Sequence, residues 1–435
     1  MKLSKSTLII AMTAALPWMS AHAQSAADMQ KQILMLQEQL KTLQTQVEAM
    51  SAKDKEAVNP TEFNRLVQKM ELKEETAQKS GLSDLTLKGS IEAAYIYNKN
   101  SNQNFSAGNG YAGVGMFEVS KQTEAGQGIN WTLRLTPGSG TYLQSGGLVN
   151  EASISVPLGD GAPRVIAGLI PDWTGYEQYF AHQNPLISHN LYFNFAAATS
   201  YTGAGLQHTF GPSATPIVAK FMLANIDKPN SNKHAPGLVY NANWTASEYT
   251  YLNLAGVHSG ATVSSSSIDP LTGAAVTTVS ARPFDIVEVD AGYTRGNLLL
   301  NGQLYFGKIK GGANNGLGDA AWYGLSGLAG YKITPRLQTL ARVDFMNNRK
   351  NGGGMYVPDG AVFGPELDST GAVVDQDRGT TRSALTLGTN YAVNPTTQWK
   401  TELRFDRSSG YNFTDSAGQP TKKNTTVGTS LVVSF

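Results

Sequence analysis

The last twelve residues, 424–435 (NTTVGTSLVVSF), alternate between apolar and small or polar side chains. Because successive side chains of a strand point to opposite sides, Val427, Leu431, Val433 and Phe435 share one face of an extended strand. A soluble protein buries such a face, whereas a transmembrane β-barrel turns it to lipid and surrounds a wet lumen. The rest of the chain decides between these two orientations.

The same period of two recurs from Ser83 onward and predicts sixteen antiparallel strands. The expected strands are residues 85–97, 112–122, 128–136, 148–158, 163–170, 198–210, 216–226, 237–246, 248–258, 284–294, 297–308, 321–332, 336–346, 381–392, 397–407 and 424–435. Seven short connections alternate with eight long ones, including 171–197, 259–283 and 347–380. This asymmetry is typical of transmembrane barrels. We therefore expect an all-β membrane protein, a 16-stranded antiparallel transmembrane barrel over residues 82–435, with both termini on the short-turn side.

The residues before the barrel have a different period. Lys2 and Lys5 precede an uncharged run, and Ala21 and Ala23 provide small residues for cleavage, so residues 1–23 are expected to be a signal peptide. Residues 24–58 contain apolar positions spaced alternately by four and three, which predicts a short α-helical coiled coil in the periplasm. Its expected oligomer seam is Ile33, Leu36, Leu40, Leu43 and Val47.

About three heptads are marginal as an isolated helix. Association of whole barrels would raise the local concentration of the helices, so we expect a homotrimer, although the stripe could instead dock on its own barrel. Asn59, Pro60 and Glu62 are typical of a helix start, and residues 59–81 are expected to form a linker helix.

Composition narrows the function. Charged residues make up 15% of the 435 residues, and 45 glycines and 18 tyrosines are unusual for a cytosolic enzyme. No apolar stretch after the signal is long enough for a membrane helix. The near-neutral charge gives no reason to expect a nucleic-acid partner, and cysteine is absent. The histidines show no metal-ligand spacing, the GxGxxG match at 108–113 precedes no helix, and no cofactor, metal or catalytic residue is expected.

Residues 171–197 form the best candidate for a pore constriction, because a loop so rich in aromatic residues is expected to fold into the lumen rather than extend into water. The alternatives are that it packs on a neighbouring subunit or forms part of a strand. The expected constriction residues are Asp172, Tyr176, Glu177, Tyr179, His182 and His189. The polar strand faces predict lumen-facing charges at Lys88, Glu92, Arg134, Lys220, Arg342, Lys400, Glu402 and Arg404. Loop acids opposite these bases would create a transverse field that favours polar solutes.

The exported heptad segment, the Asn59-Pro60 helix, the strand LKGSIEAAY at 87–95 and the aromatic third loop together resemble the proteobacterial β-barrel porins with a periplasmic coiled coil. The resemblance implies an outer-membrane barrel in contact with lipid, usually a trimer, that allows passive diffusion of small hydrophilic solutes or ions. By the same resemblance, the terminal strand looks like the signal that the outer-membrane barrel assembly machinery reads, carried here by Leu431, Val433 and Phe435.

Two other functions stay open from sequence. An outer-membrane barrel enzyme of the lipase or protease type would need a Ser-His or acidic dyad assembled at one rim, and no Gly-x-Ser-x-Gly elbow surrounds the serines at 264–267. A structural tether would use the coiled coil to reach across the periplasm. Three heptads span only about 30 Å, so we expect tethering to be a secondary role.

Overall fold

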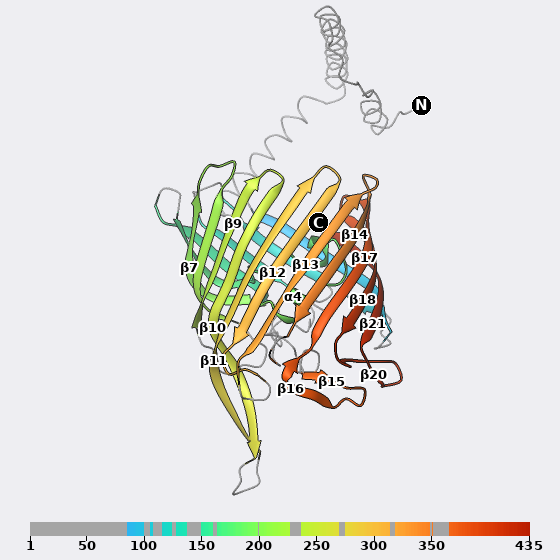
Figure 1. Ribbon diagram of the computed structural model, residues 1–435. Coiled ribbons are helices and arrows are strands. Elements are labelled where there is room, and N and C mark those ends of the chain that lie inside the picture. Colours follow the sequence, from blue (N-terminus) through green and yellow to red (C-terminus); the bar gives the residue numbers. More distant parts are fainter. Residues whose placement is uncertain are drawn as a thin grey trace, which may run out of the picture. The chain divides into compact units, whose positions relative to one another are not determined.

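The computed structural model describes residues 85–99, 105–107, 115–123, 128–136, 149–159, 163–198, 200–226, 236–268, 275–313, 318–348, 350 and 365–435 (Figure 1). The expected signal peptide, the coiled coil with its seam and the linker helix lie outside the described residues. No helix of the described part is long and apolar enough to cross a membrane.

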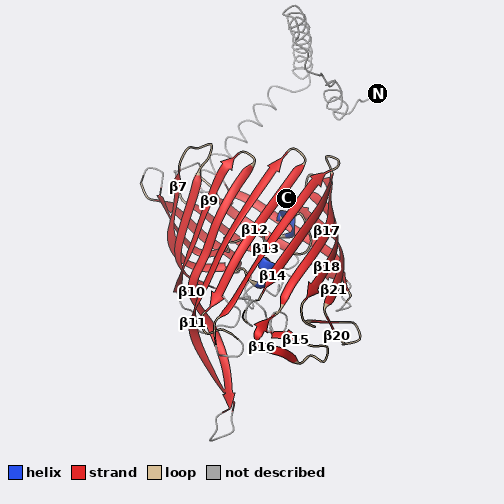
Figure 2. Cartoon of the chain, in the orientation of Figure 1, coloured by secondary structure: helices blue, strands red, loops and turns tan. Residues whose placement is uncertain are grey.

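Sixteen antiparallel strands close into a barrel, which confirms the predicted architecture (Figures 1 and 2). They are β1 (Leu85–Asn98), β3 (Gly115–Lys121), β4 (Asn130–Leu135), β5 (Val149–Pro157), β6 (Pro163–Pro171), β7 (Ser200–Phe210), β8 (Ile217–Ile226), β9 (Pro236–Ser247), β10 (Thr250–Ile268), β11 (Ala275–Arg295), β12 (Leu298–Ile309), β13 (Ala320–Lys332), β14 (Leu337–Asn347), β17 (Thr381–Asn394), β18 (Thr397–Ser408) and β21 (Lys423–Ser434).

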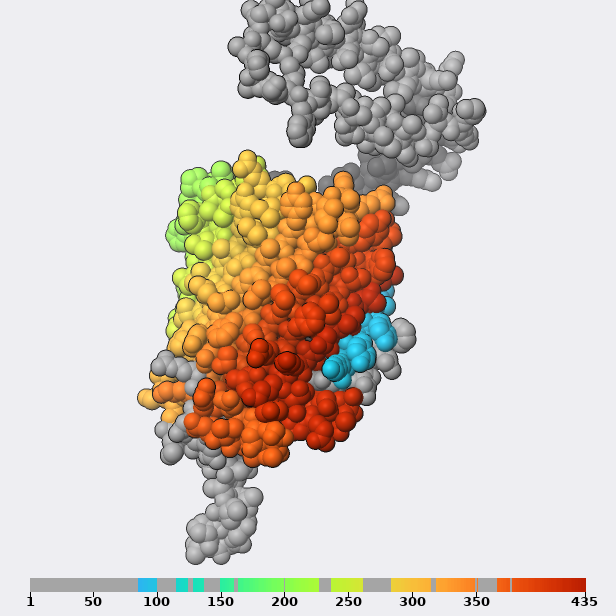
Figure 3. All heavy atoms as spheres, turned by 45° about the vertical axis from the view of Figure 1, so that its right-hand side comes forward, coloured from blue at the N-terminus to red at the C-terminus, as the bar shows by residue number. Residues whose placement is uncertain are grey.

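The barrel closes between its first and last strands. β1 pairs with β3 on one side and with β21 on the other, where Ile91 lies opposite Val433. Figure 3 shows the light-blue atoms of β1 beside the red and orange C-terminal strands. Gly89 and Phe435 extend this seam with two backbone hydrogen bonds of 3.0 Å. Closure satisfies backbone groups that an open edge would leave unpaired in lipid.

The alternation along each strand places apolar residues outside and polar residues inside. On β14, Val343 is 53% exposed, whereas its neighbours Arg342 and Asp344 are 0% exposed. On β11, Val287 and Val289 are exposed and Glu288 between them is buried. This is the reverse of a soluble protein and is typical of a barrel with a lipid-facing outer surface.

One long connection was predicted wrongly. Residues 259–283 were expected to form a loop. Instead, β10 and β11 continue as a paired ribbon beyond the rest of the barrel, from the pair Ser259 and Phe284 to the pair Ile268 and Ala275 (Figure 1). The segment is rich in valine and threonine, which favour extended backbone, and antiparallel pairing satisfies its backbone groups. Other long connections also contain short strands: β2 (Phe105–Ala107), β15 (Pro365–Leu367), β16 (Val373–Gly379), β19 (Phe413–Thr414) and β20 (Pro420–Thr421).

The connection between β6 and β7, residues 172–198, lies inside the barrel, and we call it the inserted loop. It contains a 3-10 turn, η1 (Ala181–Gln183), and a one-turn helix, α4 (Leu191–Phe195), seen in blue within the strands in Figure 2. The Asn190 side chain accepts a hydrogen bond from the backbone N–H of Phe193 (2.8 Å) and so caps α4. The helix packs beside β13 and β14, and its buried Leu191 and Tyr192 share an apolar cluster with inward residues of β7–β14.

Candidate pore constriction

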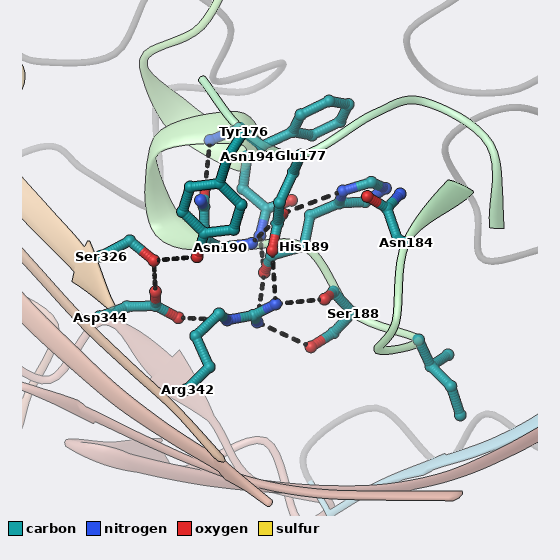
Figure 4. Close-up of polar contacts among 12 residues, drawn as sticks. Tyr176, Glu177, Asn184, Ser188, His189, Asn190, Asn194, Ser326, Arg342 and Asp344 are labelled. Atoms are coloured by element: carbon teal, nitrogen blue, oxygen red, sulfur yellow. Dashed lines mark hydrogen bonds and ion pairs between the residues drawn. The ribbon is translucent and has the colours of Figure 1, made fainter. Parts of the chain in front are cut away.

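Arg342 fixes the middle of the inserted loop to β14 (Figure 4). Its guanidinium group donates to Glu177 Oε1 and to the carbonyl oxygen of Ser188 at 2.7 Å, and to the carbonyl oxygen of His189 at 2.9 Å. On the wall side, Arg342 Nε donates to Asp344 Oδ2 at 3.0 Å. A buried arginine is favourable only when its donors and its charge are both compensated. Here two carboxylates and two carbonyl groups compensate it.

β18 provides a second set of contacts to the same loop. Arg404 Nη1 donates to the carbonyl oxygen of His189 at 2.6 Å, while Asp406 balances its charge at 2.9 Å. Glu402 Oε2 accepts from the backbone N–H groups of Ile187 (2.8 Å) and Ser188 (2.9 Å). The loop backbone is therefore held by wall residues that match its donors and acceptors.

Lys400 completes the β18 contacts at the η1 turn. Its ammonium group donates to the carbonyl oxygens of Ala181 and Asn184, and the side chain is buried. Glu92, buried on the inward face of β1, interacts electrostatically with this lysine. Lys400 thereby attaches both ends of η1 to β18.

Glu177 and His189 form a buried pair within the loop. The pKa of Glu177 lies below its usual value. Burial alone would raise it, but the charge of Arg342 and the hydrogen bond from His189 outweigh this effect. Burial lowers the pKa of His189 despite its contact with Glu177. A neutral imidazole facing an ionised carboxylate at 3.2 Å must donate through Nδ1. The pair is thus a hydrogen bond between a neutral histidine and an ionised glutamate.

The N-terminal end of the loop is fixed in other ways. Asp172 accepts hydrogen bonds from the hydroxyl groups of Thr174 and Tyr201, and burial raises its pKa to about 6. Tyr176 contacts Ser326 on β13 at 2.6 Å, and Ser326 in turn donates to Asp344 at 2.6 Å. This network links the loop to the same carboxylate that supports Arg342.

The wall of β1, β3, β4 and β5 carries charges that remain partly accessible. Arg134 bridges Glu118 (2.6 Å) and Glu151 (2.8 Å), and its side chain keeps 17% of its exposure. Its guanidinium group also lies 5.4 Å from the Phe180 ring of the loop. Lys88 is 58% exposed and lies 3.7 Å from Glu118. This wall therefore faces the space that the inserted loop leaves open.

The residues predicted from sequence fall into two groups. Five of the six predicted constriction residues make contacts that hold the loop: Asp172, Tyr176, Glu177, Tyr179 and His189. The sixth, His182, is half-buried, and its Nδ1 atom has no hydrogen-bond partner among the described residues. All eight predicted wall charges occupy inward positions, but the loop covers Arg342, Lys400, Glu402 and Arg404.

Several residues of the site were missed. Glu118 alternates with Ser120 on the polar face of its strand, so the period of two could have identified it. Asn190 directly precedes the apolar LYFNF segment, which is a helix-capping signal. Ser188 contacts the wall through its carbonyl oxygen, its N–H group and its hydroxyl group, and no sequence signal marks it. Within the described residues, no group of three or more histidine, aspartate or glutamate side chains could hold a metal ion.

A closed sixteen-stranded barrel with an apolar exterior, a polar interior and an inserted loop defines an outer-membrane barrel of the porin type. The chain belongs to the family described as "Putative beta-barrel porin-2, OmpL-like", which it matches over residues 84–435. No curated protein matches the sequence.

Solved structures show the same fold at low sequence identity. In vitro folded OmpT, an outer membrane protein of Vibrio cholerae, has a TM-score of 0.54 and 10% identity, covering 81% of this chain and 97% of that one. The anion-selective porin from Comamonas acidovorans has a TM-score of 0.53 and 14% identity, covering 81% and 99%. At these identities the likeness establishes the fold alone.

Proposed function

We propose that this protein is an outer-membrane porin for passive diffusion of small hydrophilic solutes or ions, with the inserted loop as its constriction. The observation that carries the proposal is the position of that loop. Residues 172–198 lie inside the barrel, are fixed to β14 and β18 by buried charges, and leave the polar wall around Arg134 accessible. A loop that narrows a water-filled barrel sets which solutes pass.

The direct test uses the purified, folded protein in a planar lipid bilayer. We expect stepwise increases in conductance, and a salt gradient would give the ion preference from the reversal potential. Heat-denatured protein from the same preparation is the control. A folded protein that produces no conductance steps would contradict the proposal.

We also propose that the barrel is not an enzyme. Support comes from the match to a porin family over residues 84–435. Two histidine–carboxylate pairs in the described part of the chain could act as a general base with an orienting carboxylate: His258 with Asp285 at 2.7 Å and His189 with Glu177 at 3.2 Å. The side chains of the second pair are at most 6% exposed, so a lipid or peptide substrate could not reach them, whereas those of the first pair are 46% exposed. Hydrolysis of lipid esters or peptides by the folded protein, lost on substitution of His258 or His189, would contradict this view.

We propose a homotrimer whose coiled coil, residues 24–58, lies in the periplasm. A trimer form is known for Vibrio cholerae OmpT, whose structure has a TM-score of 0.51 to this chain. Support for the periplasmic side comes from the closing seam, which puts Phe435 beside Gly89 near the start of β1. Deleting residues 24–58 should weaken trimer assembly and leave the conductance of each barrel unchanged. Loss of conductance in a folded deletion variant would mean that this segment belongs to the pore.

We propose that the terminal strand also serves as the signal for the barrel assembly machinery. Phe435 is 69% exposed in the folded barrel and Leu431 and Val433 share its outward face, so packing in the barrel interior does not account for these apolar side chains. Phe435→Ser should reduce the amount of inserted barrel and leave single-channel conductance unchanged. Insertion at the normal level, measured from isolated outer membranes, would contradict this role.

A further inference from the structure

A cavity of about 320 Å³ lies between the inserted loop and the inward faces of β4–β8. It is separate from the contacts around Arg342, which involve β13, β14 and β18. Its size is at the lower end of the range of small-molecule sites, about 300–1,000 Å³. Its lining includes Arg164, Gln207 and Lys220 on one edge and Ile166, Ile170 and Trp173 on another.

The polar edge of the cavity follows from strand register. Arg164 on β6 lies opposite Gln207 on β7, and Gln207 lies opposite Lys220 on β8. Adjacent strands are about 4.8 Å apart, so the three side chains form one inward row across three strands. In this row the cations of Arg164 and Lys220 lie on opposite sides of the Gln207 amide.

Neither cation is held in an ion pair by another described residue. Among the described residues, neither Lys220 nor Arg164 has an ion pair within 4.0 Å. Arg164 donates to Ser155 Oγ (2.7 Å) and to the carbonyl oxygens of Ser155 (2.8 Å) and Gly128 (3.1 Å), which are all neutral. Lys220 Nζ lies 5.3 Å from the centre of the Trp173 ring. A partly covered cation without a counter-ion favours an anionic ligand.

The one carboxylate that lines the cavity is Glu151, whose Oε2 lies 2.8 Å from Arg134 and whose other oxygen accepts from Ser153 Oγ at 2.7 Å. Glu151 also attracts Lys220 without forming an ion pair with it, and it shares Arg134 with Glu118. One carboxylate beside the two cations Lys220 and Arg164 leaves one positive charge in excess in the lining. The cavity combines a net positive polar edge with an apolar edge made by Trp173 and two isoleucines.

We infer that this cavity is a binding site for a small organic carboxylate with an apolar or aromatic body. The carboxylate binds at Lys220, with Gln207 as a neutral donor beside it, and the apolar body lies against Trp173. The inference rests on the proposed porin function, because it names the class of solute that the barrel retains during passage. A weak site of this kind raises the local concentration of such solutes without blocking their release.

Benzoate and its neutral analogue benzamide test the inference with the full-length, folded protein. Equilibrium dialysis in detergent gives binding, and benzoate added at constant KCl concentration gives the saturable decrease in pore conductance. We expect benzoate to bind at least about tenfold more tightly than benzamide, because only benzoate pairs with the ammonium group.

Lys220→Gln should weaken benzoate binding by about tenfold or more, and Lys220→Arg should largely restore it, because the charge is kept. The matched control is Lys332→Gln, which removes the same charge from an exposed lysine at the end of β13 and should leave binding unchanged. Equal binding of benzoate and benzamide, or unchanged benzoate binding in Lys220→Gln, would overturn the inference. If no protein conducts in bilayers, the porin function fails, and dialysis alone still decides whether the site exists.

Discussion

Two walls of this barrel carry similar inward charges and use them differently. On β14 and β18, Arg342 and Lys400 are 0% exposed because the inserted loop rests on them. On β4 the Arg134 side chain keeps 17% of its exposure, and on β1 that of Lys88 keeps 58%. The first wall holds the loop, and the second faces the remaining lumen. The position of the loop, rather than the type of charge, decides whether a lumen residue is structural or available to a solute.

Replacing Arg342 should have the largest effect, since it contacts the loop at three residues. Arg342→Ala removes the positive charge that balances the buried carboxylates of Glu177 and Asp344, which keep only hydrogen bonds from neutral groups such as His189 and Ser326, and this costs about 3–5 kcal/mol. The sixteen-stranded ladder does not depend on this side chain, so the barrel should still fold while the loop leaves the wall. We expect a higher single-channel conductance and new proteolytic cleavage within 172–198.

Arg336→Ala is the matched control for that experiment. Arg336 lies in the exposed turn between β13 and β14, so the same chemical change occurs outside the lumen. Its conductance and cleavage pattern should equal those of the unmodified protein. Because β18 also holds the loop, unchanged conductance in Arg342→Ala contradicts a narrowing role when the barrel is folded and protease cleavage shows that the loop has left the wall.

A smaller, pH-dependent effect is expected at Asp172. Its folded-state pKa is raised to about 6 by burial, above the usual 3.8. Because the folded state holds the proton more tightly, this contribution to stability is fully present below about pH 4 and is lost as the pH rises through about 6. Its size is on the order of 3 kcal/mol. Asp172→Asn, which stays neutral, should remove this part of the pH dependence of the urea midpoint.

Glu177 provides an internal comparison, since its pKa is lowered and its contribution has the opposite sign. That stabilisation is present above its unfolded pKa of about 4.5 and is lost as the pH falls. Asp172→Asn should therefore leave the acid side of the stability curve unchanged. The assignment would be contradicted if the urea midpoint of Asp172→Asn still decreased, as the pH rises from 4 to 6, by as much as that of the unmodified protein.

The barrel could be predicted from sequence because its strands must alternate. Val343 between Arg342 and Asp344 shows the period of two directly, and lipid outside requires every strand to obey it. The ribbon of β10 and β11 was missed because its serine and threonine residues are compatible with either loop or strand.

The site was predicted less completely than the fold. The aromatic content of 171–197 indicated a loop inside the lumen, but its contacts depend on chain folding between residues more than 150 positions apart, as for Glu177 with Arg342. The sequence predicts both Lys400 and Lys220 as lumen-facing lysines on alternating strands. Only the path of the loop shows that Lys400 binds carbonyl groups of the loop, whereas Lys220 lies over the Trp173 ring and forms no ion pair with another described residue.

The smallest effect is expected at Lys88, on the accessible wall. It is 58% exposed and lies 3.7 Å from Glu118, which Arg134 already pairs at 2.6 Å. An exposed pair of this kind contributes about 0–1 kcal/mol, so Lys88→Gln should leave stability unchanged and shift the reversal potential slightly toward cation preference. Arg134→Gln, which removes a bridge between two carboxylates, should shift it further in the same direction. Equal shifts for the two variants would mean that the accessible wall acts only through its net charge.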